Sequence, residues 1–280
     1  MKKCLISCCF TCIGKIFILS ANLYIQPAFA VDNLRLTDIR SLGMGGNEAT
    51  QSSLSNPALI TLHACKSVGT DYINRYSVKE LGTVHIGFQY PNIVLPASVD
   101  IFSFGYDKYR ETMFRVSVGK LLNEKWRVGI GIQYAFLQTD ILEDVPKRLS
   151  IDMGLLYSPV DKLFIGLLIM NFPSISLNPE KIEIKDFTDY SVQIGFQWDI
   201  MNRLLIAGTA GTDKEMTITG SAGMEYIPFD KFRIRAGIKL SPLLPSMGIG
   251  YSFYRFTVDA AVVYHSVLGI SSGLGLKYTF

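Results

Sequence analysis

The sequence predicts an all-β fold, a transmembrane antiparallel β-barrel of about 14 strands with an N-terminal hatch segment. Three observations predict it: regular alternation of apolar and polar residues in many segments, a mean hydropathy of +0.26 without a long apolar run after the N-terminus, and an aromatic last residue. Residues 269–280 alternate almost throughout and end at Phe280. A period of two places one strand face against lipid and the other toward a lumen.

Residues 1–30 are predicted to be a signal peptide that is cleaved after Ala30. The chain begins with a methionine and two lysines, continues with an apolar stretch, and reaches the small-residue site Ala28-Phe29-Ala30. All but one of the five cysteines lie in this segment, so the mature chain keeps only Cys65 and has no disulfide framework or thiolate metal site. Removal of the segment's three lysines from the 27 basic residues leaves 24, equal to the 24 acidic residues. This balance does not indicate a nucleic-acid partner.

Residues 31–66 lack strand alternation and are predicted to form a hatch, or plug, inside the barrel. The segment contains Arg40-Ser-Leu-Gly43-Met-Gly45-Gly46 and, further on, Asn56-Pro57-Ala58. Glycines permit tight turns in a crowded lumen, and Asn-Pro favours a sharp bend. The glycine cluster is not followed by Gly-Lys-Ser/Thr and is therefore not a phosphate-binding loop. The alternative is a flexible periplasmic lead.

Residues 67–280 are predicted to form the barrel. In Trp126 to Leu137, for example, apolar side chains share one face, whereas Arg127, Gly129, Gly131, Gln133 and Ala135 share the other. The other segments have the same length and pattern as a tilted membrane-spanning strand. The predicted strands are residues 68–76, 82–90, 97–106, 112–119, 126–137, 148–158, 162–170, 189–198, 203–211, 216–227, 231–240, 246–254, 256–265 and 269–280.

The connections and aromatic residues agree with this topology. With a periplasmic N-terminus, the longest gap, residues 171–188, lies on the outer side, as expected of a barrel with short periplasmic turns. Most even-numbered strands end in an aromatic residue, which places an aromatic girdle at one membrane interface. At the chain terminus, Leu276, Tyr278 and Phe280 resemble the signal that barrel-assembly machinery reads.

Charged side chains fall on the predicted lumen faces. Glu225 and Arg233 are expected to face each other if the turn at residues 228–231 centres its hairpin there. The charges either link the wall and pack the plug or form a selectivity surface. The predicted lumen charges include Arg115, Arg127, Asp152, Glu225, Arg233, Arg235 and Asp259.

The sequence does not predict an enzyme, a cofactor or a metal site. His63, His85 and His265 lie on separate segments without metal-ligand spacing. Ser266 adjoins His265, but neighbouring strand residues point to opposite faces, so this pair cannot act as nucleophile and base.

The string from Arg40 to Gly46, followed by Asn56-Pro57-Ala58 and the strand pattern, resembles the PorV/PorQ family of Bacteroidota outer-membrane proteins, within the FadL-like barrel superfamily. The resemblance implies a cell outer-membrane location and a non-enzymatic scaffold or shuttle of type IX secretion. Its implied partners are outer-membrane lipid, the assembly machinery, and secretion-system proteins or a secreted cargo domain. The alternative is a FadL-like passive transporter, whose partner is a hydrophobic small molecule that passes through a lateral opening.

Overall fold

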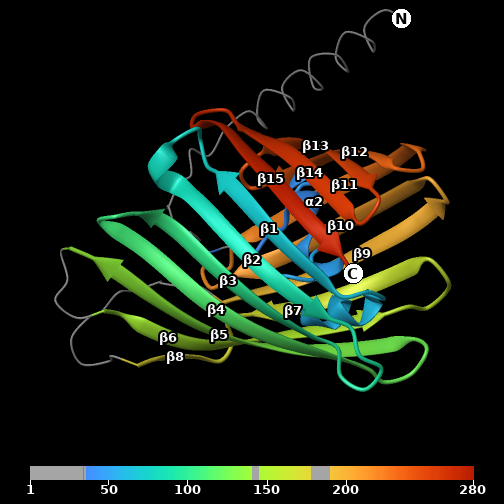
Figure 1. Ribbon diagram of the computed structural model, residues 1–280, viewed down its shortest axis with the longest axis horizontal. Coiled ribbons are helices and arrows are strands. Elements are labelled where there is room, and N and C mark those ends of the chain that lie inside the picture. Colours follow the sequence, from blue (N-terminus) through green and yellow to red (C-terminus); the bar gives the residue numbers. More distant parts are fainter. Residues whose placement is uncertain (1–33, 35, 141–144, 178–189) are drawn as a thin grey trace, which may run out of the picture. The chain divides into compact units, whose positions relative to one another are not determined.

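The computed structural model describes residues 34, 36–140, 145–177 and 190–280. These residues form a closed antiparallel barrel of 14 strands, which confirms the predicted fold class (Figure 1). The predicted signal peptide lies outside the described residues. The barrel strands are β1 (Ser67–Asn74), β2 (Gly82–Tyr90), β3 (Ala97–Tyr106), β4 (Tyr109–Leu121), β5 (Trp126–Thr139), β6 (Lys147–Tyr157), β7 (Leu163–Met170), β9 (Ser191–Met201), β10 (Leu204–Asp213), β11 (Ile218–Phe229), β12 (Phe232–Leu240), β13 (Leu244–Phe253), β14 (Phe256–His265) and β15 (Gly269–Thr279).

The barrel closes where the first strand pairs with the last. Ser67 of β1 lies opposite Thr279 of β15, and the pairing continues to Asn74 opposite Ser272. The first and last strands therefore leave no free edge between them, as a barrel in lipid requires. The end of the barrel that holds Ser67 and Thr279 is called the terminal end here, and the opposite end is called the loop end.

Part of the segment predicted as a loop, residues 171–188, belongs to the wall. Ser174–Ser176 forms a short strand, β8, that pairs with β6 at Arg148–Ser150, whereas β7 pairs with β6 from Met153 onward. The seventh strand is therefore broken between Met170 and Ser174. A segment as short as β8 cannot show alternation, so the sequence pattern could not reveal it.

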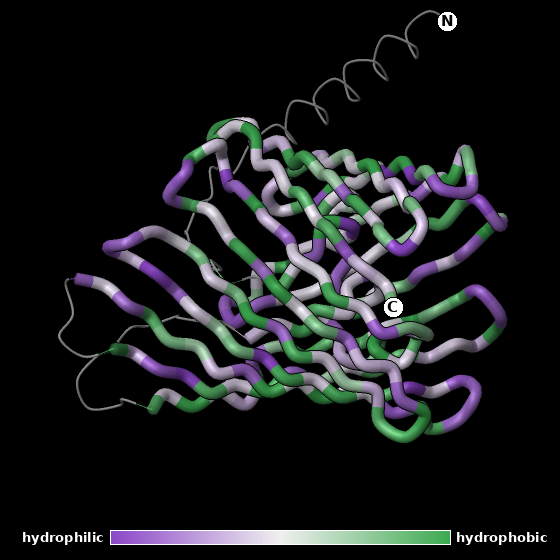
Figure 2. The backbone as a smooth tube through the Cα atoms, viewed as in Figure 1, coloured by the Kyte–Doolittle hydropathy of each residue, from purple (hydrophilic) through white to green (hydrophobic). Residues whose placement is uncertain are grey.

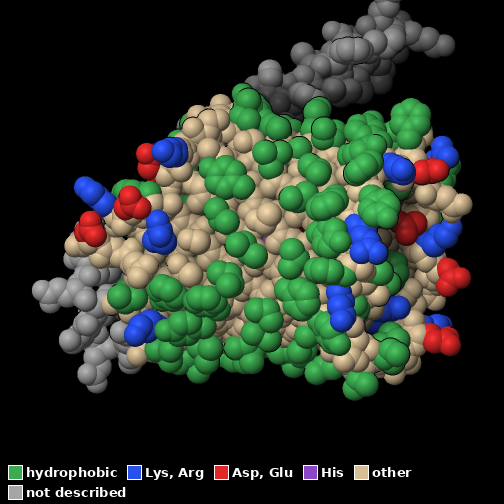
Figure 3. Space-filling view, in the orientation of Figure 1, with side chains coloured by type: hydrophobic (Ala, Val, Ile, Leu, Met, Phe, Trp, Pro, Cys, Tyr) green, Lys and Arg blue, Asp and Glu red, His purple; other side chains and the backbone are tan. Residues whose placement is uncertain are grey.

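The outer surface carries the apolar face of the strands. Ile130 and Ile194 are 51% and 56% exposed, whereas the neighbouring Gln193 is only 6% exposed. Hydrophobic side chains cover the strands on the face shown in Figure 3, and charged side chains gather at its two ends. When the backbone is coloured by hydropathy, many turns at the two ends are hydrophilic (Figure 2). This distribution is typical of a wall that faces lipid between two aqueous phases.

The N-terminal segment lies inside the barrel. Its helix α2 (Ile39–Gly43) contacts β12 to β15, and its helix α3 (Glu48–Gln51) contacts β7, β9 and β10. The 3-10 helix η1 (Pro57–Leu62) contacts β4 to β6; a second 3-10 helix, η2 (Lys79–Leu81), lies between β1 and β2. In the described part of the chain, no helix is long and apolar enough to cross a membrane.

Candidate functional site: the plugged lumen

Helix α2 is fixed to the wall by ion pairs. The guanidinium of Arg40 donates from Nε and Nη2 to the Glu225 carboxylate, at 3.1 and 2.9 Å. Glu225 also accepts from Nε of Arg235 at 2.6 Å, and Nη1 of Arg235 donates to Asp259 at 2.5 Å. The Asp38 side chain caps the helix by accepting from the Ser41 amide, and burial raises the pKa of this carboxyl.

The expected pairing of Glu225 with Arg233 is wrong. Glu225 lies opposite Arg235, because the turn closes with Phe229 opposite Phe232 and an irregularity between Tyr226 and Phe229 shifts the register by one residue. Arg233 consequently lies nearer the terminal end, where its Nη1 donates to Ser252 Oγ at 2.6 Å.

The glycines of the hatch allow it to approach the wall backbone. Gly45 has φ +81°, and a Cβ atom there would lie 2.7 Å from the carbonyl oxygen of Ile238. Its amide donates to Ser246 Oγ at 3.0 Å. A Cβ atom on Gly43 would lie 3.1 Å from Gly248 Cα, whereas Gly46, also at positive φ, has open space around it. A side chain at position 45 would be excluded both by its backbone conformation and by the neighbouring strand.

Asn56-Pro57-Ala58 forms the start of η1. Asn56 Oδ1 accepts from the Ala58 amide at 3.0 Å, and Asn56 Nδ2 donates to the Ala49 carbonyl at 2.6 Å. Pro57 occupies the first turn of this helix, where no amide donor is needed. The opposing wall positions include Gly129 and Gly154, where a Cβ atom would collide with the 56–58 backbone or side chains. The tripeptide therefore fits a surface without side chains.

The remaining predicted lumen charges have different roles. Arg115 and Asp152 form a fully buried pair at 3.1 Å, and Nη2 of Arg115 also donates to the Ser55 carbonyl of the hatch at 3.1 Å. The half-buried guanidinium of Arg127 lies 5.9 Å from the ring centre of Phe164. Its Nε and Nη1 atoms have no hydrogen-bond partner among the described residues. Arg115 thus joins wall to plug, whereas Arg127 makes a cation–π contact within the wall.

The three histidines lie apart from one another in the structure. The His85 ring lies between two carboxylates: Nδ1 is 2.9 Å from Asp71 Oδ2, and Nε2 is 3.1 Å from Asp100 Oδ1. The same ring stacks on Phe102. His265 lies at the loop end, where Nδ1 accepts from the amides of residues 267 and 268. Burial, together with Lys277 and Arg40, lowers the pKa of His63 to about 4. Within the described residues, no group of His, Cys, Asp and Glu side chains is arranged to hold a metal ion.

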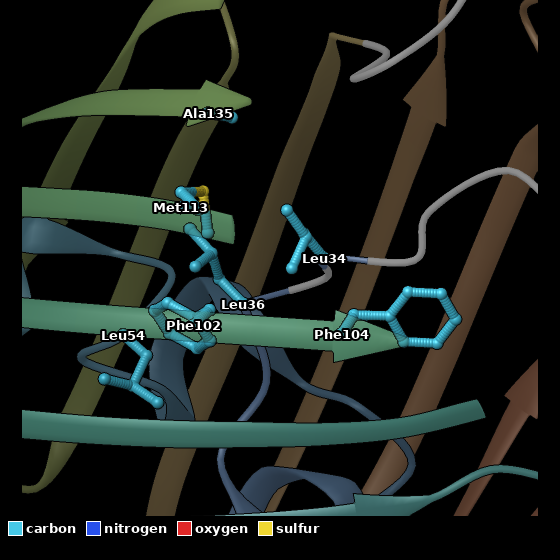
Figure 4. Packing of buried hydrophobic residues seen from close by; sticks show 7 residues of the cluster. All are labelled: Leu34, Leu36, Leu54, Phe102, Phe104, Met113 and Ala135. Carbon is cyan, nitrogen blue, oxygen red and sulfur yellow. The ribbon is translucent and has the colours of Figure 1, made fainter. Parts of the chain in front are cut away.

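An apolar cluster lies between the hatch and strands β3 to β5. Leu34, Leu36 and Leu54 of the N-terminal segment pack there against inward-facing wall residues (Figure 4). The wall partners, all buried, are Phe102, Phe104, Met113 and Ala135. Sequence reasoning did not find this cluster, although Phe102, Phe104 and Met113 interrupt the polar face of their strands.

A second region of the lumen is polar and open. A cavity of about 620 Å³ lies between the hatch and the wall, and residues of the terminal end, among them Ser67 and Thr279, line it. Its lining includes Arg40, His63, Gln89, Arg233, Thr257 and Lys277. Leu54 belongs to the apolar cluster and also lines this cavity, so the two regions meet at that residue.

The comparison with solved structures gives the same fold. The toluene transporter TodX of Pseudomonas putida matches with a TM-score of 0.63 and 10% identity, over 86% of this chain and 97% of that chain. The CymD monoaromatic hydrocarbon channel matches with a TM-score of 0.62 and 14% identity, over 90% and 99%. A FadL homologue of Pseudomonas aeruginosa matches with a TM-score of 0.59 and 12% identity, over 88% and 98%. The fold is that of the FadL-like outer-membrane barrels.

Comparison by sequence does not assign the chain to a family. No family model matches the chain, and no curated protein matches its sequence. The PorV/PorQ resemblance therefore stays a hypothesis, whereas the FadL-like barrel architecture is shown by the structural neighbours. Of those neighbours, TodX is described as a toluene transporter and CymD as a monoaromatic hydrocarbon channel.

Proposed function

We propose that this protein is a passive outer-membrane channel for hydrophobic small molecules. The observation that carries the proposal is the apolar cluster inside the lumen. A water-filled pore has a polar interior, whereas Phe102, Phe104 and Met113 turn apolar side chains inward. A hydrophobic solute that took the place of Leu34 and Leu36 would keep these side chains out of water.

The break in the seventh strand lies at the level of this cluster. Ala135 of the cluster is opposite Arg148 on β6, which is opposite Ser176 on β8. Among the described residues, β8 pairs with no strand on its other edge. An interruption there offers a route between the apolar cluster and the membrane, in which a hydrophobic solute does not cross water. We propose this interruption as the lateral opening that the FadL-like alternative implies.

The names of the structural neighbours support the proposed channel function. TodX and CymD are described as a toluene transporter and a monoaromatic hydrocarbon channel. The scaffold or shuttle function in type IX secretion stays a prediction, because most of the predicted outer loop at residues 171–188 lies outside the described residues. A secretion partner captured at that loop would support the scaffold function.

The experiment measures entry of the hydrophobic dye 1-N-phenylnaphthylamine into cells that produce the protein in the outer membrane. The Met113→Glu variant places a charge in the apolar cluster and should slow dye entry to the rate of cells without the protein. Met113→Leu keeps volume and polarity and should transport like the wild type. Heat-modifiable electrophoretic mobility verifies that both variants fold. Dye entry that is equal with and without the wild-type protein would refute the proposal.

A further inference from the structure

The turn between β2 and β3, residues 91–96, is apolar and exposed at the terminal end of the barrel. Its sequence is Pro-Asn-Ile-Val-Leu-Pro, without a charged residue. Ile93 is fully exposed, and Val94 and Leu95 are 66% and 47% exposed. Three consecutive exposed apolar side chains are unfavourable in water, so this composition indicates that the turn meets an apolar partner.

The backbone of this turn is held by hydrogen bonds. The Asn92 side chain accepts from the Val94 amide at 2.9 Å. Lys120 Nζ, from the end of β4, donates to the Val94 carbonyl at 2.9 Å, and the Pro96 carbonyl accepts from the Gly119 amide at 2.9 Å. These bonds satisfy polar groups of the turn and leave the side chains of residues 93–95 exposed.

The turn continues the lipid-facing surface of the wall. Tyr90, which directly precedes it, ends the exposed face of β2. Beyond it, Leu121 and Leu122 at the end of β4 are 49% and 59% exposed, and Trp126 of β5 stacks on Tyr157 of β6 with ring centres 4.3 Å apart. Because such aromatic rings prefer the membrane interface, the turn lies where the lipid-covered wall meets the headgroups.

Two exposed lysines flank the turn. Lys66, which directly precedes β1, has its Nζ 4.8 Å from the centre of the Tyr90 ring, and Lys120 lies on the other side. Among the described residues, neither ammonium group has a carboxylate within ion-pair distance, whereas Arg203 at the same end lies 3.8 Å from Asp230. Strands β1 and β4 are about 14 Å apart at the usual strand spacing, so the two lysines would meet different anionic groups.

We propose that this part of the terminal end binds anionic phospholipids of the surrounding membrane. The side chains of Ile93, Val94 and Leu95 enter the boundary between headgroups and acyl chains, which removes their surface from water. The ammonium groups of Lys66 and Lys120 then lie at the level of the headgroups, where they bind lipid phosphates. Continuity with the lipid-facing wall favours a lipid over an acidic protein as the partner. The inference uses only the outer surface and does not depend on the proposed channel function.

The test titrates the full-length mature protein in detergent with dioleoyl phosphatidylglycerol or dioleoyl phosphatidylcholine and measures bound lipid by native mass spectrometry. The anionic phosphatidylglycerol should bind more tightly than the zwitterionic phosphatidylcholine. Lys66→Gln and Lys120→Gln should each weaken phosphatidylglycerol binding about fivefold, the contribution of one basic residue near an anionic surface, and should leave phosphatidylcholine binding unchanged. The control is Lys79→Gln, which removes an exposed lysine at the loop end and should bind both lipids like the wild type.

A second variant tests the apolar part of the surface. Ile93→Ser should weaken the binding of both lipids about tenfold, because it removes apolar contact and no charge. Its control is Met216→Ser, since Met216 is 74% exposed on the turn between β10 and β11 at the loop end. Heat-modifiable mobility verifies that each variant folds. Equal affinity of the wild type for the two lipids would overturn the proposal and favour an acidic protein partner, and so would normal phosphatidylglycerol binding by the folded Lys66→Gln, Lys120→Gln and Ile93→Ser proteins.

Discussion

Replacement of Arg40 by Met should loosen the hatch without unfolding the barrel. Arg40 is the residue of α2 that joins the hatch to the wall acid Glu225 through two hydrogen bonds. Met keeps much of the length and the apolar stem but removes both donors. The wall pair of Glu225 with Arg235 remains in place, so the substitution acts on the contact between hatch and wall.

The expected loss of hatch stability in Arg40→Met follows from the contacts of Arg40. A hydrogen bond to a charged group contributes about 1.5 to 3 kcal/mol. The Arg40 side chain is 35% exposed, and Glu225 keeps a second cation, so solvent screening and the remaining partner reduce the loss. We therefore expect the hatch to be destabilised by about 1 to 3 kcal/mol, or about 5- to 150-fold in the population of its displaced state.

Single-channel recording in planar bilayers measures this population as the fraction of time in a conducting state. Deletion of residues 31–55 should give the largest fraction of time in the conducting state, because it removes α2, α3 and their wall contacts. The control is Arg203→Met, which removes a 3.8 Å pair with Asp230 between highly exposed side chains and should change nothing measurable. If Arg40→Met conducts like the wild type while the deletion opens the lumen, Arg40 does not hold the hatch. An unchanged deletion variant would show that the hatch does not close the barrel.

Three further predictions concern the wall, a hatch histidine and the chain terminus. Ile194→Arg should reduce the free energy of unfolding in lipid by about 2 to 4 kcal/mol, and Gln193→Arg by less, since only Ile194 faces outward; equal losses would contradict this face assignment. Because the folded-state pKa of His63 is lowered to about 4, the unfolded chain gains a proton first as pH falls from about 6.5, and stability should decrease by at most about 3 kcal/mol by pH 4. His63→Asn should flatten the dependence of the urea midpoint on pH, and an unchanged slope would refute this. Deletion of Phe280, whose ring packs edge-on against Tyr278, should lower the outer-membrane yield; a normal yield would remove its role in assembly.

The sequence predicted the strands because their signal is local. The segment predicted at residues 126–137 is observed as Trp126–Thr139, and that predicted at residues 231–240 as Phe232–Leu240. Alternation also assigned the faces, since Ile130 is exposed on the outside and Gln133 is buried inside. These properties depend on neighbours two residues apart and on the solvent that each face meets.

The contacts inside the lumen could not be predicted in the same way. The partner of Glu225 depended on where the turn closes and on the irregularity beside it, and a partner two residues away leaves the alternation of both strands unchanged. His85 meets Asp71 and Asp100 only because strands β1, β2 and β3 are paired in one register. Their sequence positions alone did not indicate this contact.

The sequence by itself determined a barrel wall with an apolar outside, and a glycine-rich segment suited to close packing. Only the tertiary structure decided that Leu34 and Leu36 pack on Phe102 and Met113, and that Arg233 donates to Ser252. The reason is physical: a face pattern is repeated in every strand and tolerates many arrangements, whereas packing and ion pairing require particular atoms from distant segments to meet at distances of a few ångströms.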